Sequence, residues 1–460
     1  MDQRGSGHST RLDCVTMPIN ITGSPQGNSF EISQVPACAH ELEKKYGDLA
    51  SFSITSAATD VATFISAFTN GLNTIVCGLN FGTLIVERLI HLSPPEVTGY
   101  VLDGFAGMSG ASRDKAPSYS AYDSNFGEVG DAFLELCGKI SECSERFVSK
   151  SLPATLQDVI TQFDENPKST CAALVSDSNR DWSSEPASYN LRRALSVILP
   201  DASMRTIIPP VVYRLNRCKP VDIDLLKPFF KIPRQPQLNS SDDSAFVSPL
   251  LKYLVNYSEL WEKPTPSIAK MTSRVTDALI SPAKVYSDVP IYCAFSKEES
   301  AVCDKLDLGN YRGNGIIYEV DKYWNKSAKI PPQASVLLLS GKLNPVTPHK
   351  YAESLMEALI GEKKELVTFE YTAHDALVSV SFDQGKDNYG MEILLSYVTN
   401  DGDLELLDKS CVEEMPALNM TPNFITQLLF LGTNDPYDGM HDKGLIDDVI
   451  SSFSPVENES

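Results

Sequence analysis

The chain has 460 residues, 42% of them hydrophobic, which is enough to bury a large core in one domain with an insertion or in two domains. Its formal net charge of −21 and its pI near 4.7 argue against nucleic acid or an anionic membrane surface as a partner. The apolar run from Phe424 to Leu431 is too short, and too interrupted by polar residues, to span a membrane.

Short buried runs and helical patterns alternate in the first part of the chain. Helical patterns cover 35–46 and 55–69, and a β-branched run over 74–79 predicts the first strand. A helix over 84–92 and a buried strand over 97–102, which ends at Asp103-Gly104, follow at once. This rhythm with short links indicates a parallel sheet of the α/β class.

From about residue 112 to residue 290 the segments become longer, more polar and mainly helical. The expected helices cover 129–136, 156–163, 190–199, 248–261 and 268–279, and prolines lie between several of them. We interpret this part of the chain as a helical cap that is inserted into the sheet rather than as further strands.

The α/β rhythm returns near the C-terminus. The expected elements are a strand at 335–339, a helix at 348–359, a strand at 366–371 and a helix at 391–399. The predicted organisation is therefore a first core part (1–111), the cap (112–290), a second core part (291–420) and an acidic tail (421–460). The segment from Thr433 onward is expected to be frayed or disordered.

Cysteines and sequons point to an extracellular protein. The N-x-S/T sequons start at Asn20, Asn239, Asn256, Asn325, Asn419 and Asn458. Cys137/Cys143 and Cys293/Cys303 are close enough for local bridges, and Cys14/Cys38 and Cys171/Cys218 are possible further pairs, although connectivity does not follow from sequence. Cys411 and Cys77 remain, and we expect Cys77 to be a buried thiol. The chain opens without the basic and apolar leader of a secretion signal.

The turn that follows the first predicted strand carries the clearest functional pattern. Gly78-x-Asn80-x-Gly82 has the spacing of the nucleophile elbow G-x-S-x-G, a sharp strand-to-helix turn that presents its central side chain above the sheet. An ordinary strand-to-helix turn with two glycines is the alternative. The central residue is Asn80, whose amide cannot act as a hydroxyl nucleophile. In an α/β-hydrolase the acid and the histidine follow on loops after late strands, and Asn344 and His374 occupy those places.

Six segments, in order along the chain, match the motifs of one family. They are Asp2–Ser9 (D-Q-R-G-x-G-x-S), Gly78–Thr83 (G-x-S-Y-G-T), Val101–Gly104 (V-L-D-G), Gly341–Pro348 (G-x-x-D-P-x-T-P), Ala373-His374 (G-H) and Tyr397–Cys411 (Y-x-x-D-G…C). With them the chain resembles the prolyl-aminopeptidase and tripeptidyl-aminopeptidase family of secreted serine peptidases. The resemblance implies an α/β-hydrolase fold, no cofactor, and an oxyanion donor at the backbone amide of Phe81.

Two of the three triad positions depart from the family pattern. The nucleophile position holds Asn80 and the acid position holds Asn344, so only His374 is retained. Loss of a triad nucleophile costs roughly 10⁶-fold in turnover in subtilisin. Replacing the acid by its amide costs roughly 10⁴-fold in a trypsin-type enzyme. The sequence therefore predicts a catalytically inactive relative of a serine exopeptidase.

The start of the chain departs from the family as well. In the family, the loop that resembles Asp2–Ser9 follows four sheet strands, a glycine-rich oxyanion loop and a signal peptide. Because this chain starts at that loop, we expect the first strands of the sheet to be missing and the strand at 74–79 to form an exposed edge. Of the two usual oxyanion donors, only the amide of Phe81 then remains.

Two other readings stay open. One is an active serine peptidase whose sequence is incomplete or miscalled at positions 80 and 344. The other is a secreted peptide-binding or decoy protein, in which acidic cap residues hold a free amino terminus. The candidates for that role are Asp222, Asp224, Asp242, Asp243 and Glu259. The expected partners are peptides or protein N-termini, and the scattered histidines predict no metal site.

Overall fold

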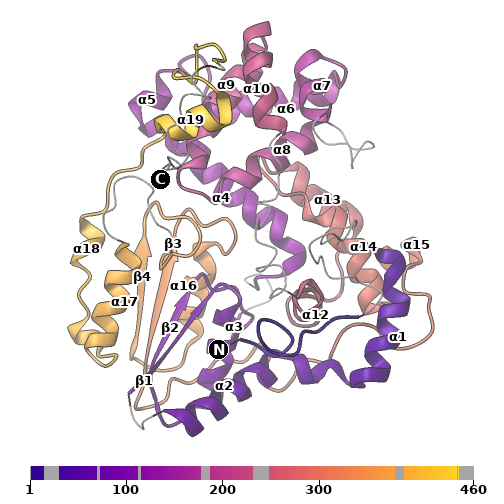
Figure 1. Cartoon of the computed structure of the whole chain (residues 1–460), viewed down its shortest axis with the longest axis vertical. Coiled ribbons are helices and arrows are strands. Elements are labelled where there is room, and N and C mark those ends of the chain that lie inside the picture. Colours follow the sequence, from indigo (N-terminus) through magenta and orange to yellow (C-terminus); the bar gives the residue numbers. More distant parts are fainter. Residues whose placement is uncertain are drawn as a thin grey trace, which may run out of the picture.

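The computed structural model describes residues 2–14, 31–69, 73–111, 116–177, 187–231, 248–378, 388–442 and 444. Its strands are β1 (Thr74–Leu79), β2 (Val97–Asp103), β3 (Ser335–Gly341) and β4 (Lys364–Phe369). They form one parallel sheet in the order β1-β2-β3-β4. The expected fold class, an α/β architecture in which a large helical insertion interrupts a parallel sheet, is confirmed (Figure 1).

The two central strands are apolar on both faces, as strands covered by helices must be. Tyr100 and Leu102 of β2 pack into one core, and Val101 between them packs into the other. The first core contains helices α2 (Ile54–Phe68), α3 (Gly82–Leu92) and α16 (His349–Ala358). The second contains α17 (Tyr389–Thr399) and α18 (Ser410–Glu413).

Strand β1 forms an edge of the sheet, as the sequence predicted. In the described part of the chain it pairs with β2 alone, with Cys77 opposite Val101. The side chain of Cys77 is exposed, so the expectation of a buried thiol is wrong. Because β1 has a strand on one side only, Cys77 has fewer neighbours than a residue of a central strand has.

The inserted helices, which we call the helical layer, lie above the sheet and, from α12 onward, to its right in the view of Figure 1. They are α4 (Tyr122–Leu136), α5 (Ser141–Ser144), α6 (Leu152–Glu165), α7 (Thr170–Asp177), α8 (Ala187–Ile198), α9 (Ile208–Arg217), α10 (Pro220–Lys231), α12 (Pro249–Glu259) and α13 (Ile268–Thr276). Helices α14 (Lys284–Ser296) and α15 (Ala301–Leu306) complete the layer. Helices α4 to α10 share one apolar core, whereas α12 and α14 share another with α1 (Val35–Tyr46) near the N-terminus.

Short 3₁₀ helices connect several of these elements. They are η1 (Ile32–Gln34), η2 (Leu49–Phe52), η3 (Tyr119–Ala121), η4 (Cys137–Lys139), η6 (Met204–Ile207) and η7 (Leu404–Leu406). None of the helices in the described ranges is both long enough and apolar enough to cross a bilayer.

The C-terminal segment packs against the cap. Helix α19 (Phe424–Leu431) buries Leu428 and Leu431. Beyond it, the buried Arg214 of α9 donates from Nε to the carbonyl of Pro436 at 2.6 Å and pairs with Asp222 at 3.0 Å. The expectation of a frayed segment is therefore wrong for residues 433–442, because a buried guanidinium needs the carbonyl acceptors that this segment supplies. The rest of that segment, apart from residue 444, lies outside the described residues.

All four cysteine pairs considered from the sequence are disulfides. They are Cys14–Cys38, Cys137–Cys143, Cys171–Cys218 and Cys293–Cys303, and Cys77 and Cys411 are free thiols. Such bridges are compatible with an extracellular protein.

Candidate functional site

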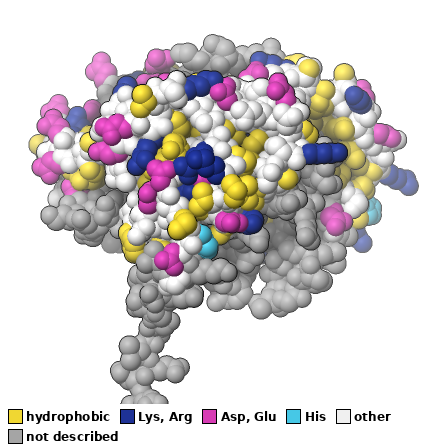
Figure 2. Space-filling model, turned by 90° about the horizontal axis from the view of Figure 1, so that it is seen from above, with side chains coloured by type: hydrophobic (Ala, Val, Ile, Leu, Met, Phe, Trp, Pro, Cys, Tyr) yellow, Lys and Arg dark blue, Asp and Glu magenta, His cyan; other side chains and the backbone are white. Residues whose placement is uncertain are grey.

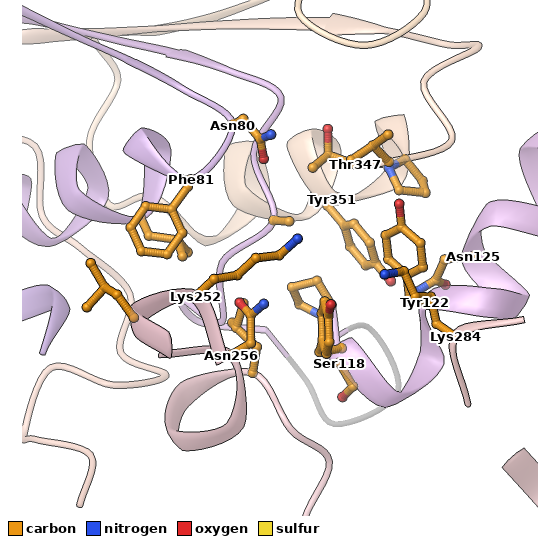
Figure 3. Close-up of a pocket in the computed structure, with 18 of the residues that line it drawn as sticks. Asn80, Phe81, Ser118, Tyr122, Asn125, Lys252, Asn256, Lys284, Thr347 and Tyr351 are labelled. Carbon is orange, nitrogen blue, oxygen red and sulfur yellow. The ribbon is translucent and has the colours of Figure 1, made fainter. Parts of the chain in front are cut away.

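Three of the motif segments meet at one cavity of about 470 Å³, between the sheet and the helical layer. The N-terminal loop contributes Gln3 and Ser6, and the elbow contributes Asn80 and Phe81. The loop after β3 contributes 346–348. Figure 3 shows Asn80, Phe81 and Thr347 around this space, opposite side chains of the cap. Because the carboxyl ends of parallel strands meet at one sheet edge, distant segments of the sequence come together here.

The elbow has the strand, sharp turn and helix that the sequence predicted. Asn80 adopts a φ of 47°, and its backbone N–H donates a hydrogen bond to the backbone carbonyl of Asp103 on the next strand at 2.9 Å. A Cβ on Gly78 would lie 2.6 Å from the carbonyl oxygen of Gly82, closer than such atoms approach. The sharp turn therefore requires a glycine at position 78, and it presents the exposed carboxamide of Asn80 to the cavity.

Asn344 organises the loop that follows β3. Its side chain is buried, and its Oδ1 accepts hydrogen bonds from the backbone amides of Val346 and Thr347, both at 3.0 Å. Its Nδ2 donates to Thr347 Oγ1 at 2.6 Å. The carboxamide thus accepts hydrogen bonds through Oδ1 and donates one through Nδ2. A carboxylate could not supply that donor.

His374 lies beside Asn344, as the predicted order of the triad positions requires. Its Nδ1 is 3.2 Å from Asn344 Oδ1 and 3.4 Å from Thr347 Oγ1. Since Oδ1 can only accept, this contact favours a proton on Nδ1 and leaves the lone pair on Nε2. Burial lowers the pKa of His374, which favours the neutral ring. Neither Asn344 nor His374 is among the residues that line the cavity, although Thr347 is.

No sequence motif singles out Asp375, which lies at the other ring nitrogen. Its Oδ1 is 3.2 Å from His374 Nε2, and neither atom has a hydrogen-bond partner in the described part of the chain. Burial raises the pKa of Asp375, which favours its protonated, neutral form. The only available signals were its position after His374 and the tolerance of aspartate for a positive φ, which is 56° here.

The amide of Phe81 precedes helix α3, which begins at Gly82. The positive end of the helix dipole therefore faces the elbow. This position is compatible with the predicted oxyanion donor, and the role itself stays a prediction.

The acidic residues that were expected to hold a free amino terminus do not line the cavity. Asp222 pairs with Arg214 and Arg217, Asp224 pairs with Lys227, and Glu259 pairs with Arg88. Asp242 and Asp243 lie outside the described residues. Each of the three acids that the structure describes already neutralises a cation of the protein, so none of them supports the alternative of a site for a free amino terminus.

Nothing in the described ranges groups three or more His, Cys, Asp or Glu side chains in a way that could hold a metal ion.

Comparison with known proteins adds little. No family model and no curated protein matches the sequence. Among solved structures, an esterase from Exiguobacterium antarcticum is similar at 13% identity and a TM-score of 0.26, over 75% of this chain and 74% of that one. So low a score supports no assignment of activity. The parallel sheet, its flanking helices and the elbow turn are consistent with an α/β-hydrolase fold.

Proposed function

We propose that this chain is a binding protein built on the fold of a serine exopeptidase, without the covalent chemistry of that family. The observation that carries the proposal is the carboxamide of Asn80 at the tip of the elbow, where the family presents its nucleophile. An amide nitrogen delocalises its lone pair into the carbonyl group. The carboxamide can donate a hydrogen bond to a ligand through its nitrogen or accept one through its oxygen, but it cannot form an acyl intermediate.

The surroundings of His374 support the same proposal. In a working triad, a carboxylate at Nδ1 stabilises the imidazolium that forms when the ring takes a proton. Here the neutral Asn344 faces Nδ1, and Nε2, the nitrogen that would serve a nucleophile, faces Asp375 instead. The buried ring also resists protonation, so it is poorly suited to act as a general base.

The elbow and the loop after β3 keep their shape without the catalytic groups. Gly78 still allows the close approach to Gly82, and Asn344 still anchors the backbone of 346–347. The cavity between sheet and cap is within the size range of small-molecule sites. A retained pocket beside altered catalytic positions favours ligand binding over hydrolysis. The disulfides support an extracellular location for this activity.

A fluorophosphonate probe, which phosphonylates activated serines with loss of fluoride, tests the proposal on the full chain. We expect no covalent adduct by intact-protein mass spectrometry, whereas a serine hydrolase treated in parallel is fully labelled. An adduct on any residue of the elbow would contradict the proposal. Peptide mapping of the native protein tests the alternative of a miscalled sequence, which requires serine at position 80 and aspartate at position 344.

A further inference from the structure

The cavity carries a charge opposite to that of the whole chain. Two lysines, Lys252 from α12 and Lys284 from α14, line it, and none of the described lining residues is a carboxylate. The chain itself has a formal charge of −21, and Figure 2 shows both signs of charge interspersed on the outer face of the helical layer. The absence of an acid from the described lining is therefore a local feature of this site.

Neither lysine has an ion-pair partner in the part of the protein that the structure describes. No carboxylate in the described ranges comes within ion-pair distance of either ammonium group. Partial desolvation of the ammonium group, and then the charge of the neighbouring Lys284, lower the pKa of Lys252, although the residue as a whole is exposed. Figure 3 shows the nitrogen of Lys252 reaching the middle of the cavity, while Lys284 approaches from the side of Tyr122 and Asn125.

The acid Asp288 interacts electrostatically with both lysines, but it forms an ion pair with neither. It is buried, and its Oδ1 accepts a hydrogen bond from Ser287 at 3.1 Å. Its Oδ2 has no hydrogen-bond partner in the described part of the chain. Burial raises the pKa of Asp288, which weakens any compensation that it offers to the cavity.

The remainder of the lining is suited to an apolar body with polar contacts at its end. Aromatic and aliphatic side chains form much of the wall: Phe81, Leu84, Tyr122, Leu251, Leu260 and Tyr351. The amide groups of Asn80, Asn125 and Asn256 also face the cavity and can donate hydrogen bonds to an anion. The N-terminal end of α3 adds its positive dipole on the side of the elbow.

We propose that the cavity binds a small organic carboxylate with an apolar body, and that Lys252 and Lys284 hold its carboxylate group. The proposal rests on the proposed function, since the ligand occupies the site without covalent chemistry. It replaces the expected ligand, a free amino terminus, by one of opposite charge. Charge-assisted hydrogen bonds from two ammonium groups that have no ion-pair partner among the described residues favour an anion over neutral and cationic ligands.

Three probes of nearly the same shape test the charge of the ligand. Phenylbutyrate, phenylbutyramide and phenylbutylamine differ at the terminal group alone, and each is titrated into the full chain by calorimetry. We expect binding of the carboxylate, binding of the amide that is weaker by about tenfold or more, and no binding of the amine. An amine that binds as well as the carboxylate, or no heat from the carboxylate at millimolar concentration, would overturn the inference.

Lysine variants locate the anion. Lys252→Met and Lys284→Met keep the apolar stem of the side chain and remove the charge, and each is expected to weaken phenylbutyrate binding by about tenfold. Lys305→Met, on the exposed face of α15, removes the same charge away from the cavity and is expected to leave binding unchanged. Equal losses in all three variants would indicate a general effect of net charge and contradict the assignment.

An ester substrate distinguishes failure of the proposed function from failure of the proposed ligand. Methyl phenylbutyrate is added to the full chain, and release of phenylbutyrate is followed by chromatography. Hydrolysis that the elbow variant Asn80→Ala abolishes would overturn the proposed function. Failure of the carboxylate to bind, with no hydrolysis, would overturn the ligand assignment alone.

Discussion

Arg88 of α3 and Glu259 of α12 form a buried ion pair, with Nη2 2.9 Å from Oε2. Arg88 lies on the helix that starts at the elbow, and Glu259 ends the helix that carries Lys252. Tyr318 donates a further hydrogen bond to Glu259 Oε1 at 2.7 Å. The ion pair therefore ties the α/β core to the cap behind the cavity.

Replacing Arg88 by methionine is expected to destabilise the protein by about 3–5 kcal/mol, because Glu259 is left buried without its cation. Urea unfolding at neutral pH measures the loss. The matched control is Lys227→Met, which removes the partner of Asp224 from an exposed pair and is expected to cost less than about 1 kcal/mol. Similar losses in both variants would contradict a special role for the buried pair.

The two elbow glycines are expected to differ in their tolerance of a side chain. Gly78→Ala places a Cβ against the carbonyl of Gly82 and should destabilise the fold by about 2 kcal/mol or more. A Cβ on Gly82 meets no atom within 4 Å, and alanine favours the helix that begins there. Gly82→Ala should therefore be neutral or slightly stabilising. Thermal unfolding of both variants decides the point, and the reverse order would refute the geometry of the turn.

Asp103 is expected to make stability fall as the pH rises. Burial raises the pKa of Asp103 from 3.8 to about 7, although Leu377 donates a backbone hydrogen bond to it at 2.7 Å. Between these two values the folded state keeps a proton that the unfolded state releases, so unfolding becomes easier with each step in pH. Asp103→Asn should flatten this part of the stability profile in urea titrations from pH 4 to pH 7. An unchanged slope would show that Asp103 is ionised in the fold.

The sequons offer a test of the extracellular location. Asn419 is exposed, whereas Asn256 is buried in α12 and faces the cavity. In protein recovered from the medium of a eukaryotic secretion host, glycopeptide mapping should find a glycan at Asn419 and none at Asn256. A glycan at Asn256 would contradict the packing of that helix.

Local signals were sufficient to predict much of the fold. The β-branched run of β1 and the apolar run of β3 identify strands, and the Gly78-x-Asn80-x-Gly82 spacing identifies the turn between β1 and α3. The close spacing of Cys137 and Cys143 also anticipated their bridge. Each of these features depends on residues that are neighbours in the chain.

The features that the sequence did not predict depend on tertiary neighbours. Lys252 and Lys284 belong to different helices and to no motif, so only the packing of α12 beside α14 places them in one cavity. The acidic composition after Thr433 favoured disorder, because sequence alone does not reveal that Arg214 is buried and needs acceptors. Asp375 was overlooked because its importance comes from the orientation of the His374 ring.

The insertion between β2 and β3 has a consequence for the order of events during synthesis. Leu102 and Leu338 are register partners, yet the ribosome makes the entire cap between them. The pair β1-β2 therefore emerges early and must wait, with its apolar surface uncovered, until β3 is available. The cap helices α4 to α10 have a core of their own and can fold during this interval. Nascent chains stalled before Ser335 are thus the species that most needs protection from aggregation.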